Sequence, residues 1–113
     1  MAYLNELENA VLQAMCERED SYPVALRSQI KSAEVASRQN TGAGFYTCLK
    51  LDQSLALLEQ KVFDNVFAKI SGLNNPMTFV LFVRDGKIDT LEGASVEDNT
   101  TDIDFETVRF KIL

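Results

Sequence analysis

Histidine is absent from this chain of 113 residues. The missing imidazole removes the most common general base, so catalysis would have to rest on carboxylates, cysteine, lysine or tyrosine. It also argues against a zinc site, because the two cysteines, Cys16 and Cys48, would need two carboxylates to complete the coordination. The sequence therefore predicts a protein without a metal ion or cofactor.

Long apolar runs are missing as well. No stretch approaches the ~18 uninterrupted apolar residues of a membrane-spanning helix. The first residues lack the basic and apolar regions of a secretory signal. Two cysteines far apart in sequence are typical of reduced, largely buried thiols in a cytosolic protein, with a disulfide as the alternative. We expect a cytoplasmic protein that has no membrane partner.

Positive charge is scarce in one region. The formal net charge is −6, and residues 85–106 contain eight acidic residues but a single basic one, Lys87. That region carries −7 and the rest of the chain +1, so the whole excess is local. Negative charge disfavours nucleic acid as a direct partner, because phosphate binding needs the opposite sign.

The stretch around which the chain is organised is a hairpin. Met77 to Val83 is a short apolar run rich in β-branched and aromatic residues, which predicts a strand inside a sheet. Asp85-Gly86 tolerates the positive φ angles of a type I′ turn. Lys87 to Glu92 then alternates apolar and polar residues, which predicts a strand with one solvent-exposed face.

The N-terminal region predicts one helix followed by a strand. Leu4, Leu7, Val11 and Met15 recur at helical spacing over Tyr3 to Glu17, with the outer face assigned to polar residues that include Glu8. A turn is expected at Asp20-Ser21-Tyr22-Pro23. Leu26 to Arg38 reads as an irregular strand with a bulge near Lys31-Ser32, because its apolar residues change from even to odd positions.

Further strands complete the predicted fold. Arg38 to Gly44 has the composition of a loop, Phe45 to Leu51 is expected to pair with the preceding strand, and Asp52 to Gln60 fits either a short helix or a loop. Two more strands are predicted at Val62 to Ser71 and Thr107 to Leu113. The whole chain, 1–113, is expected to be a single α+β domain: an N-terminal amphipathic helix packed on a curved, mainly antiparallel sheet of about six strands.

Four patterns suggest chemistry, and each has a simpler structural explanation. Asp89 and Glu92 form a pair of carboxylates, but such residues on a hairpin are normally solvated. Cys48 has no visible activating group. Gly42-Ala43-Gly44 lacks the remaining residues of a phosphate-binding loop and precedes a strand rather than a helix. Residues 98–104 lack the glycine and glutamate of a calcium-binding loop.

The acidic region is the strongest functional signal. It is either a solvated edge that favours solubility and discourages aggregation, or a surface complementary to a basic protein. Small acidic domains that block nucleases work in the second way. Tyr46 is the expected aromatic anchor for the partner. The carboxylates expected to bind it are Asp85, Asp89, Glu92, Glu97, Asp98, Asp102 and Asp104.

Two motifs resemble those of a family of small, mostly uncharacterised bacterial proteins. They are an Arg…Thr-Gly-x-Gly-Phe segment at residues 38–45 and a Gly-Leu…Phe-x-Leu-Phe…Gly…Leu-Glu-Gly segment at residues 72–93. The chain departs from the family after Gly93, where similar chains continue with an aromatic-rich turn. Such proteins can lie beside toxin genes, so the resemblance implies an immunity role.

The function expected from the sequence is therefore a non-enzymatic, immunity-type protein that neutralises a basic toxin domain. One alternative is a structural module that self-associates as a homodimer through the less polar sheet face. Another is a small carboxylate-based enzyme, for which a pocket converging on Asp89 and Glu92 would be needed.

Overall fold

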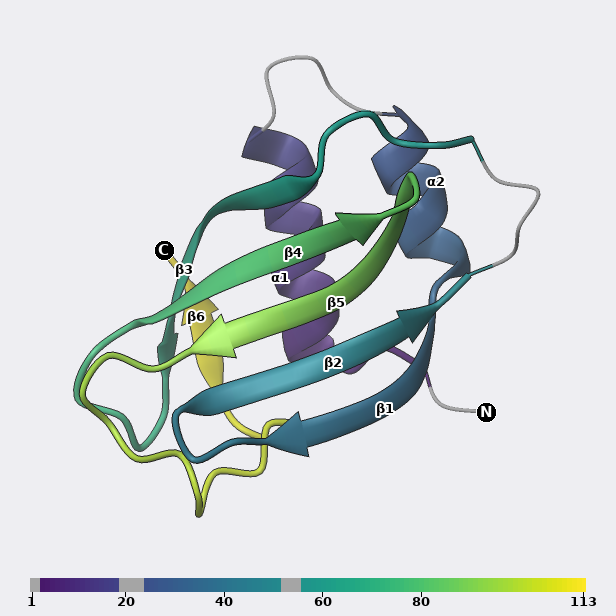
Figure 1. Ribbon diagram of the computed structural model, residues 1–113. Helices are drawn as coiled ribbons and strands as arrows, with labels where there is room; N and C mark the ends of the chain where they lie inside the picture. The colour runs from purple at the N-terminus through teal and green to yellow at the C-terminus, as the bar shows by residue number, and fades with distance from the viewer. Residues whose placement is uncertain (1–2, 19–23, 52–55) are drawn as a thin grey trace.

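The computed structural model describes residues 3–18, 24–51 and 56–113. Two helices, α1 (Glu6–Arg18) and α2 (Val24–Ser32), cover one face of a curled six-stranded sheet, as Figure 1 shows. The strands are all antiparallel and lie in the order β1-β2-β5-β4-β3-β6. Their bounds are β1 Glu34–Asn40, β2 Gly44–Lys50, β3 Val62–Ile70, β4 Met77–Arg84, β5 Lys87–Ala94 and β6 Phe110–Ile112. The α+β prediction is confirmed.

The central hairpin forms as its sequence predicts. Asp85 and Gly86 have φ angles of 53° and 79°, which a type I′ turn requires at its two central residues. The pair β4–β5 lies inside the sheet, between β2 and β3. Leu81 and Leu91 are register partners and are fully buried under the helices, so this hairpin forms the centre of the core.

The segment from Leu26 onward differs from the prediction. It begins as helix α2, and the strand β1 starts only at Glu34. Leu26 and Ile30 are four residues apart and both are buried, which is the spacing of one helix face. The change of parity that suggested a bulge near Lys31-Ser32 is the end of this helix, and the bulge in β1 lies between Val35 and Ser37.

Two other predicted boundaries change. Arg38 to Asn40 belong to β1 rather than to the loop. The last strand is only β6, because the backbone amides of Thr107 and Val108 bond to Asp104 O instead of a neighbouring strand. Residues 56–60 form neither helix nor strand, in agreement with the loop alternative for this segment. The turn predicted at residues 20–23 lies outside the described residues, and so do residues 52–55.

A buried glutamine joins the second helix to the central hairpin. Gln29 of α2 is fully buried. Its Nε2 donates to Gly86 O at 2.9 Å and to Ala56 O at 2.8 Å, and its Oε1 accepts from Ile88 N at 2.9 Å. The side chain thus bonds to three backbone groups, of which Gly86 O also accepts from Leu58 N. Among the described residues, no helix is long and apolar enough to cross a membrane.

Candidate functional site

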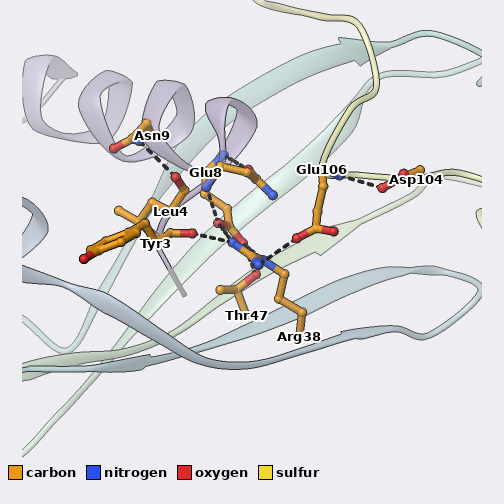
Figure 2. A network of polar contacts seen from close by, with 9 residues as sticks. Tyr3, Leu4, Glu8, Asn9, Arg38, Thr47, Asp104 and Glu106 are labelled. Carbon is orange, nitrogen blue, oxygen red and sulfur yellow. Dashed lines mark hydrogen bonds and ion pairs between the residues drawn. The ribbon is translucent and has the colours of Figure 1, made fainter. Parts of the chain in front are cut away.

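Arg38 of β1 is the centre of a polar network shown in Figure 2. Its Nε and Nη2 donate to the two carboxylate oxygens of Glu8, at 2.9 and 2.8 Å. Its Nη1 donates to Glu106 Oε1 at 2.9 Å, and Nη2 also donates to Tyr3 O at 2.8 Å. One guanidinium therefore joins the start of α1, the edge strand β1 and the chain before β6.

Glu8 is buried, contrary to its predicted place on the outer face of the helix. It forms a capping box with Asn5: Asn5 N donates to Glu8 Oε1 and Glu8 N donates to Asn5 Oδ1, both at 2.8 Å. Thr47 Oγ1 donates to Glu8 Oε2 at 2.5 Å. Burial raises the pKa of Glu8, but the hydrogen bonds from Arg38, Thr47 and Asn5 outweigh it, so the pKa lies below its ordinary value. The carboxylate is thus a charged structural group.

Residues 97–106, here called the acidic segment, are anchored to the turn between β1 and β2. Thr100 is fully buried; its Oγ1 accepts from Gly44 N at 2.9 Å, and its N donates to Gly42 O at 2.8 Å. Asn40 Nδ2 donates to Thr100 O and to Ile103 O, at 2.7 and 3.2 Å. These bonds fix the acidic segment beside the end of β1, although sixty residues separate Asn40 from Thr100.

Asp98 anchors the acidic segment to the turn between β3 and β4. Its Oδ2 accepts from Asn75 N at 2.9 Å and its Oδ1 from Asn74 Nδ2 at 3.1 Å. These bonds, the one from the Asn75 backbone foremost, hold the pKa of Asp98 below its ordinary value. Asp98 is thus a negative charge with a structural role.

A cavity of about 330 Å³ lies between the edge strand and the acidic segment. It is lined by residues 35–40 of β1, by Asn5 just before α1 and Glu8 within it, by Phe45 and Thr47 of β2 and by residues 103–106. We call it the edge cavity. Its charged lining residues are three carboxylates, Glu8, Asp104 and Glu106, and one guanidinium, that of Arg38. With all four ionised, the lining carries a net charge of −2.

The structure brings together four of the seven carboxylates predicted to bind a partner. Glu97, Asp98, Asp102 and Asp104 share the acidic segment with Glu106, and all but Asp98 are exposed. Asp85 and Asp89 lie at the other end of the central hairpin, where they line a different cavity together with Arg84 and Lys87. Six of the seven predicted carboxylates are thus divided between two ends of the sheet.

Tyr46 and Glu92 occupy a third place. They are register partners on β2 and β5, on the sheet face that carries no helix. We call it the helix-free face. It also presents several exposed apolar side chains: Val62, Phe67 and Phe82, which with Tyr46 are 39–46% exposed. Tyr46 therefore points to the helix-free face and is not part of the lining of the edge cavity.

Asp89 and Glu92 do not share the cavity that the described residues form beside Asp89. Glu92 points to the helix-free face, whereas Asp89 Oδ2 accepts a hydrogen bond from Thr90 Oγ1. The cavity beside Asp89, about 200 Å³, does not include Glu92 in its lining. Among the described residues, no group of three or more histidine, cysteine, aspartate or glutamate side chains could hold a metal ion.

Sequence reasoning missed the roles of Glu8 and Arg38. The spacing Asn5-x-x-Glu8 is the signature of a capping box, which predicts the start of the helix and a Glu8 side chain that turns back to Asn5 N. No local signal identifies Arg38 as its partner, because thirty residues separate them.

Comparison of the chain with protein-family models, with curated proteins and with solved structures gave no match.

Proposed function

We propose that this chain is a cytoplasmic, non-enzymatic protein-binding domain that binds a basic protein through the acidic segment, as an immunity-type protein binds a basic toxin domain. One observation carries the proposal. Residues 97–106 contain five carboxylates and no lysine or arginine, and hydrogen bonds at both Thr100 and Asp98 hold the segment in place.

Fixed charge of one sign suits recognition better than the same charge on a loose tail. It accelerates diffusional encounter with a basic partner and orients that partner as it arrives. Asp98 is only half-exposed and is held by the turn between β3 and β4. Glu97, Asp102, Asp104 and Glu106 are exposed, so these four are the contacts we assign to the partner. The predicted residues Asp85, Asp89 and Glu92 contribute only to the long-range field.

The test begins with isolation of the partner from the source cells on the immobilised chain. We expect a basic protein that elutes with salt and binds the purified chain. The double variant Glu97→Gln with Asp102→Asn should weaken binding by about tenfold, from two rim charge pairs of up to about 1 kcal/mol each.

The matched control removes the same charge elsewhere. Glu17 and Glu59 are both exposed, so Glu17→Gln with Glu59→Gln should leave the affinity nearly unchanged. Equal loss of affinity in both double variants would show that only net charge matters. An acidic partner, or binding that resists salt, would contradict the proposal.

Self-association through the helix-free face is the second candidate, and the exposed Phe67 and Phe82 favour it. Exposed apolar groups that gather on one face are typical of protein interfaces. Sedimentation velocity at several concentrations decides between the candidates. A dimer that Phe82→Ser dissociates would support this candidate, whereas a strict monomer would remove it.

A further inference from the structure

The edge strand β1 has backbone groups that are not used by the sheet. In the hairpin, Thr41 N donates to Gly44 O at 3.0 Å. Hydrogen-bonded pairs alternate along an antiparallel ladder, so the next such pairs are Gln39–Tyr46 and Ser37–Cys48. The amides and carbonyls of Arg38 and Asn40 therefore point away from β2. Within the described part of the chain, no hydrogen bond joins these four groups to another segment.

The two edges of the sheet are not equivalent. At the other edge, β6 has three residues, and the carbonyl of Leu113 that follows it accepts from Arg18 Nη2. Very short edge strands discourage pairing with another chain. β1 has seven residues, and Ala36, Ser37, Gln39 and Asn40 are exposed. Its bulge between Val35 and Ser37 confines regular pairing to the stretch from Ser37 to Asn40.

The edge cavity lies on the side of β1 that carries the Arg38 side chain. In an antiparallel ladder, residues directly opposite each other point to the same face. Side chains of an added strand opposite Arg38 and Asn40 would therefore lie over the edge cavity. Its apolar lining, which includes Val35, Ile103 and Phe105, can contact the stems of long side chains, and Asp104 and Glu106 can bind their ends.

We propose that the basic partner binds by strand addition: an extended segment of that partner pairs with β1 at Arg38 and Asn40 and directs lysine or arginine side chains toward Asp104 and Glu106. This inference rests on the proposed function for the sign of the partner's charge. The pairing supplies up to four main-chain hydrogen bonds, and the edge cavity with its carboxylates supplies the preference for basic side chains. Arg38 is no obstacle because the buried Glu8 neutralises it through two hydrogen bonds, while Glu106 remains exposed at the rim of the edge cavity.

A capped peptide of about seven residues that alternates lysine and valine tests strand addition without the natural partner. In the free protein, the amides of Arg38 and Asn40 should exchange with solvent faster than those of Ser37 and Gln39, which face β2. Saturating peptide should slow exchange at Arg38 and Asn40 by roughly tenfold. A matched peptide with glutamate in place of lysine should not.

The carboxylates are tested by the double variant Asp104→Asn with Glu106→Gln. Asparagine at 104 retains an acceptor for Glu106 N, which bonds to Asp104 Oδ1. The variant should bind the lysine peptide about two- to fivefold more weakly, while Glu17→Gln with Glu59→Gln should bind it as the wild type does.

Three results would overturn strand addition: unchanged exchange at Arg38 and Asn40 at millimolar peptide, peptide shifts centred on Tyr46 and Phe82, or protection already present in a free chain that sediments as a dimer. The last would assign β1 to a second copy of the chain. If a basic protein isolated from cells binds with the expected salt dependence but leaves Arg38 and Asn40 unprotected, strand addition is wrong and the proposed function stands. If no basic protein binds, the proposed function is wrong, whatever the peptide does.

Discussion

Asn40 and Thr100 lie sixty residues apart in the sequence, and the side chain of each donates a hydrogen bond to the other residue. Asn40 Nδ2 donates to Thr100 O at 2.7 Å, and Thr100 Oγ1 donates to Asn40 Oδ1 at 3.0 Å. This pair attaches the acidic segment to the edge of the sheet. Like charges along a chain repel one another and favour an extended loop. The two hydrogen bonds oppose this repulsion and hold the acidic segment beside β1.

The first prediction concerns that attachment. Thr100→Val keeps the shape of the side chain but removes the hydroxyl, which leaves the buried Gly44 N without its acceptor. The free energy of unfolding should fall by about 1–3 kcal/mol, and amide exchange should accelerate across residues 97–106. Thr101 is exposed, so Thr101→Val is the matched control and should change neither quantity. Slow exchange in Thr100→Val would show that other contacts hold the segment.

The second prediction uses the pH dependence of Glu8. Because the folded-state pKa of Glu8 lies below its ordinary value of 4.5, the ionised carboxylate stabilises the protein above that pH. This stabilisation is lost as pH falls through the folded-state pKa. Glu8→Gln should lower the free energy of unfolding by about 3 kcal/mol near neutral pH, since it leaves Arg38 without its buried partner.

Urea unfolding of both proteins at several pH values measures this difference. The gap between wild type and Glu8→Gln should be constant above pH 4.5 and should narrow below it. A gap that stays the same down to the lowest pH at which the wild type folds would mean that Glu8 acts through shape rather than charge.

The third prediction concerns Gln29, whose side chain is the partner of three backbone groups. Gln29→Leu fills the space but leaves Ile88 N without its acceptor, whereas Gly86 O keeps the bond from Leu58 N, so stability should fall by about 1–3 kcal/mol. Gln13 lies on the exposed face of α1, and Gln13→Leu should change stability by less than about 0.5 kcal/mol. Thermal unfolding compares the two. Equal effects would show that the buried hydrogen bonds contribute little.

The fourth prediction concerns Gly44. A Cβ there would lie 1.9 Å from Gly93 O on the paired strand β5. Gly44→Ala should therefore separate β2 from β5 and cost at least about 3 kcal/mol. Gly42 also has a positive φ, but its added Cβ would meet nothing closer than Thr101 Oγ1 at 3.4 Å, so Gly42→Ala should cost only about 1 kcal/mol of backbone strain. Similar losses in both variants would contradict the steric explanation.

Much of the fold could be predicted because its signals are local. The central hairpin has an apolar run, a turn dipeptide and an alternating return within sixteen residues, Met77 to Glu92. The segment from Leu26 to Ser32 could not, because Leu26 and Ile30 share parity in a strand and also share a face in a helix. Burial against the sheet decides between these two structures, and burial is not visible in the sequence.

The negative charge of the candidate site could be predicted from the sequence, but its position in the fold could not. Counting acids located the region from Asp85 to Glu106. The same count joined residues that the fold separates, because Asp85 lies before strand β5 and Glu97 lies after it, so the length of that strand stands between them. The open edge of β1 depends on the order of all six strands, so it follows only from the complete fold.

Binding at the acidic segment is tested most directly by the association rate constant between this chain and its basic partner, measured by stopped flow from about 25 to 500 mM salt. The rate should fall steeply with salt, and its slope should be shallower for Glu97→Gln with Asp102→Asn than for Glu17→Gln with Glu59→Gln. A rate that is independent of salt, or the same slope in both double variants, would contradict binding at the acidic segment.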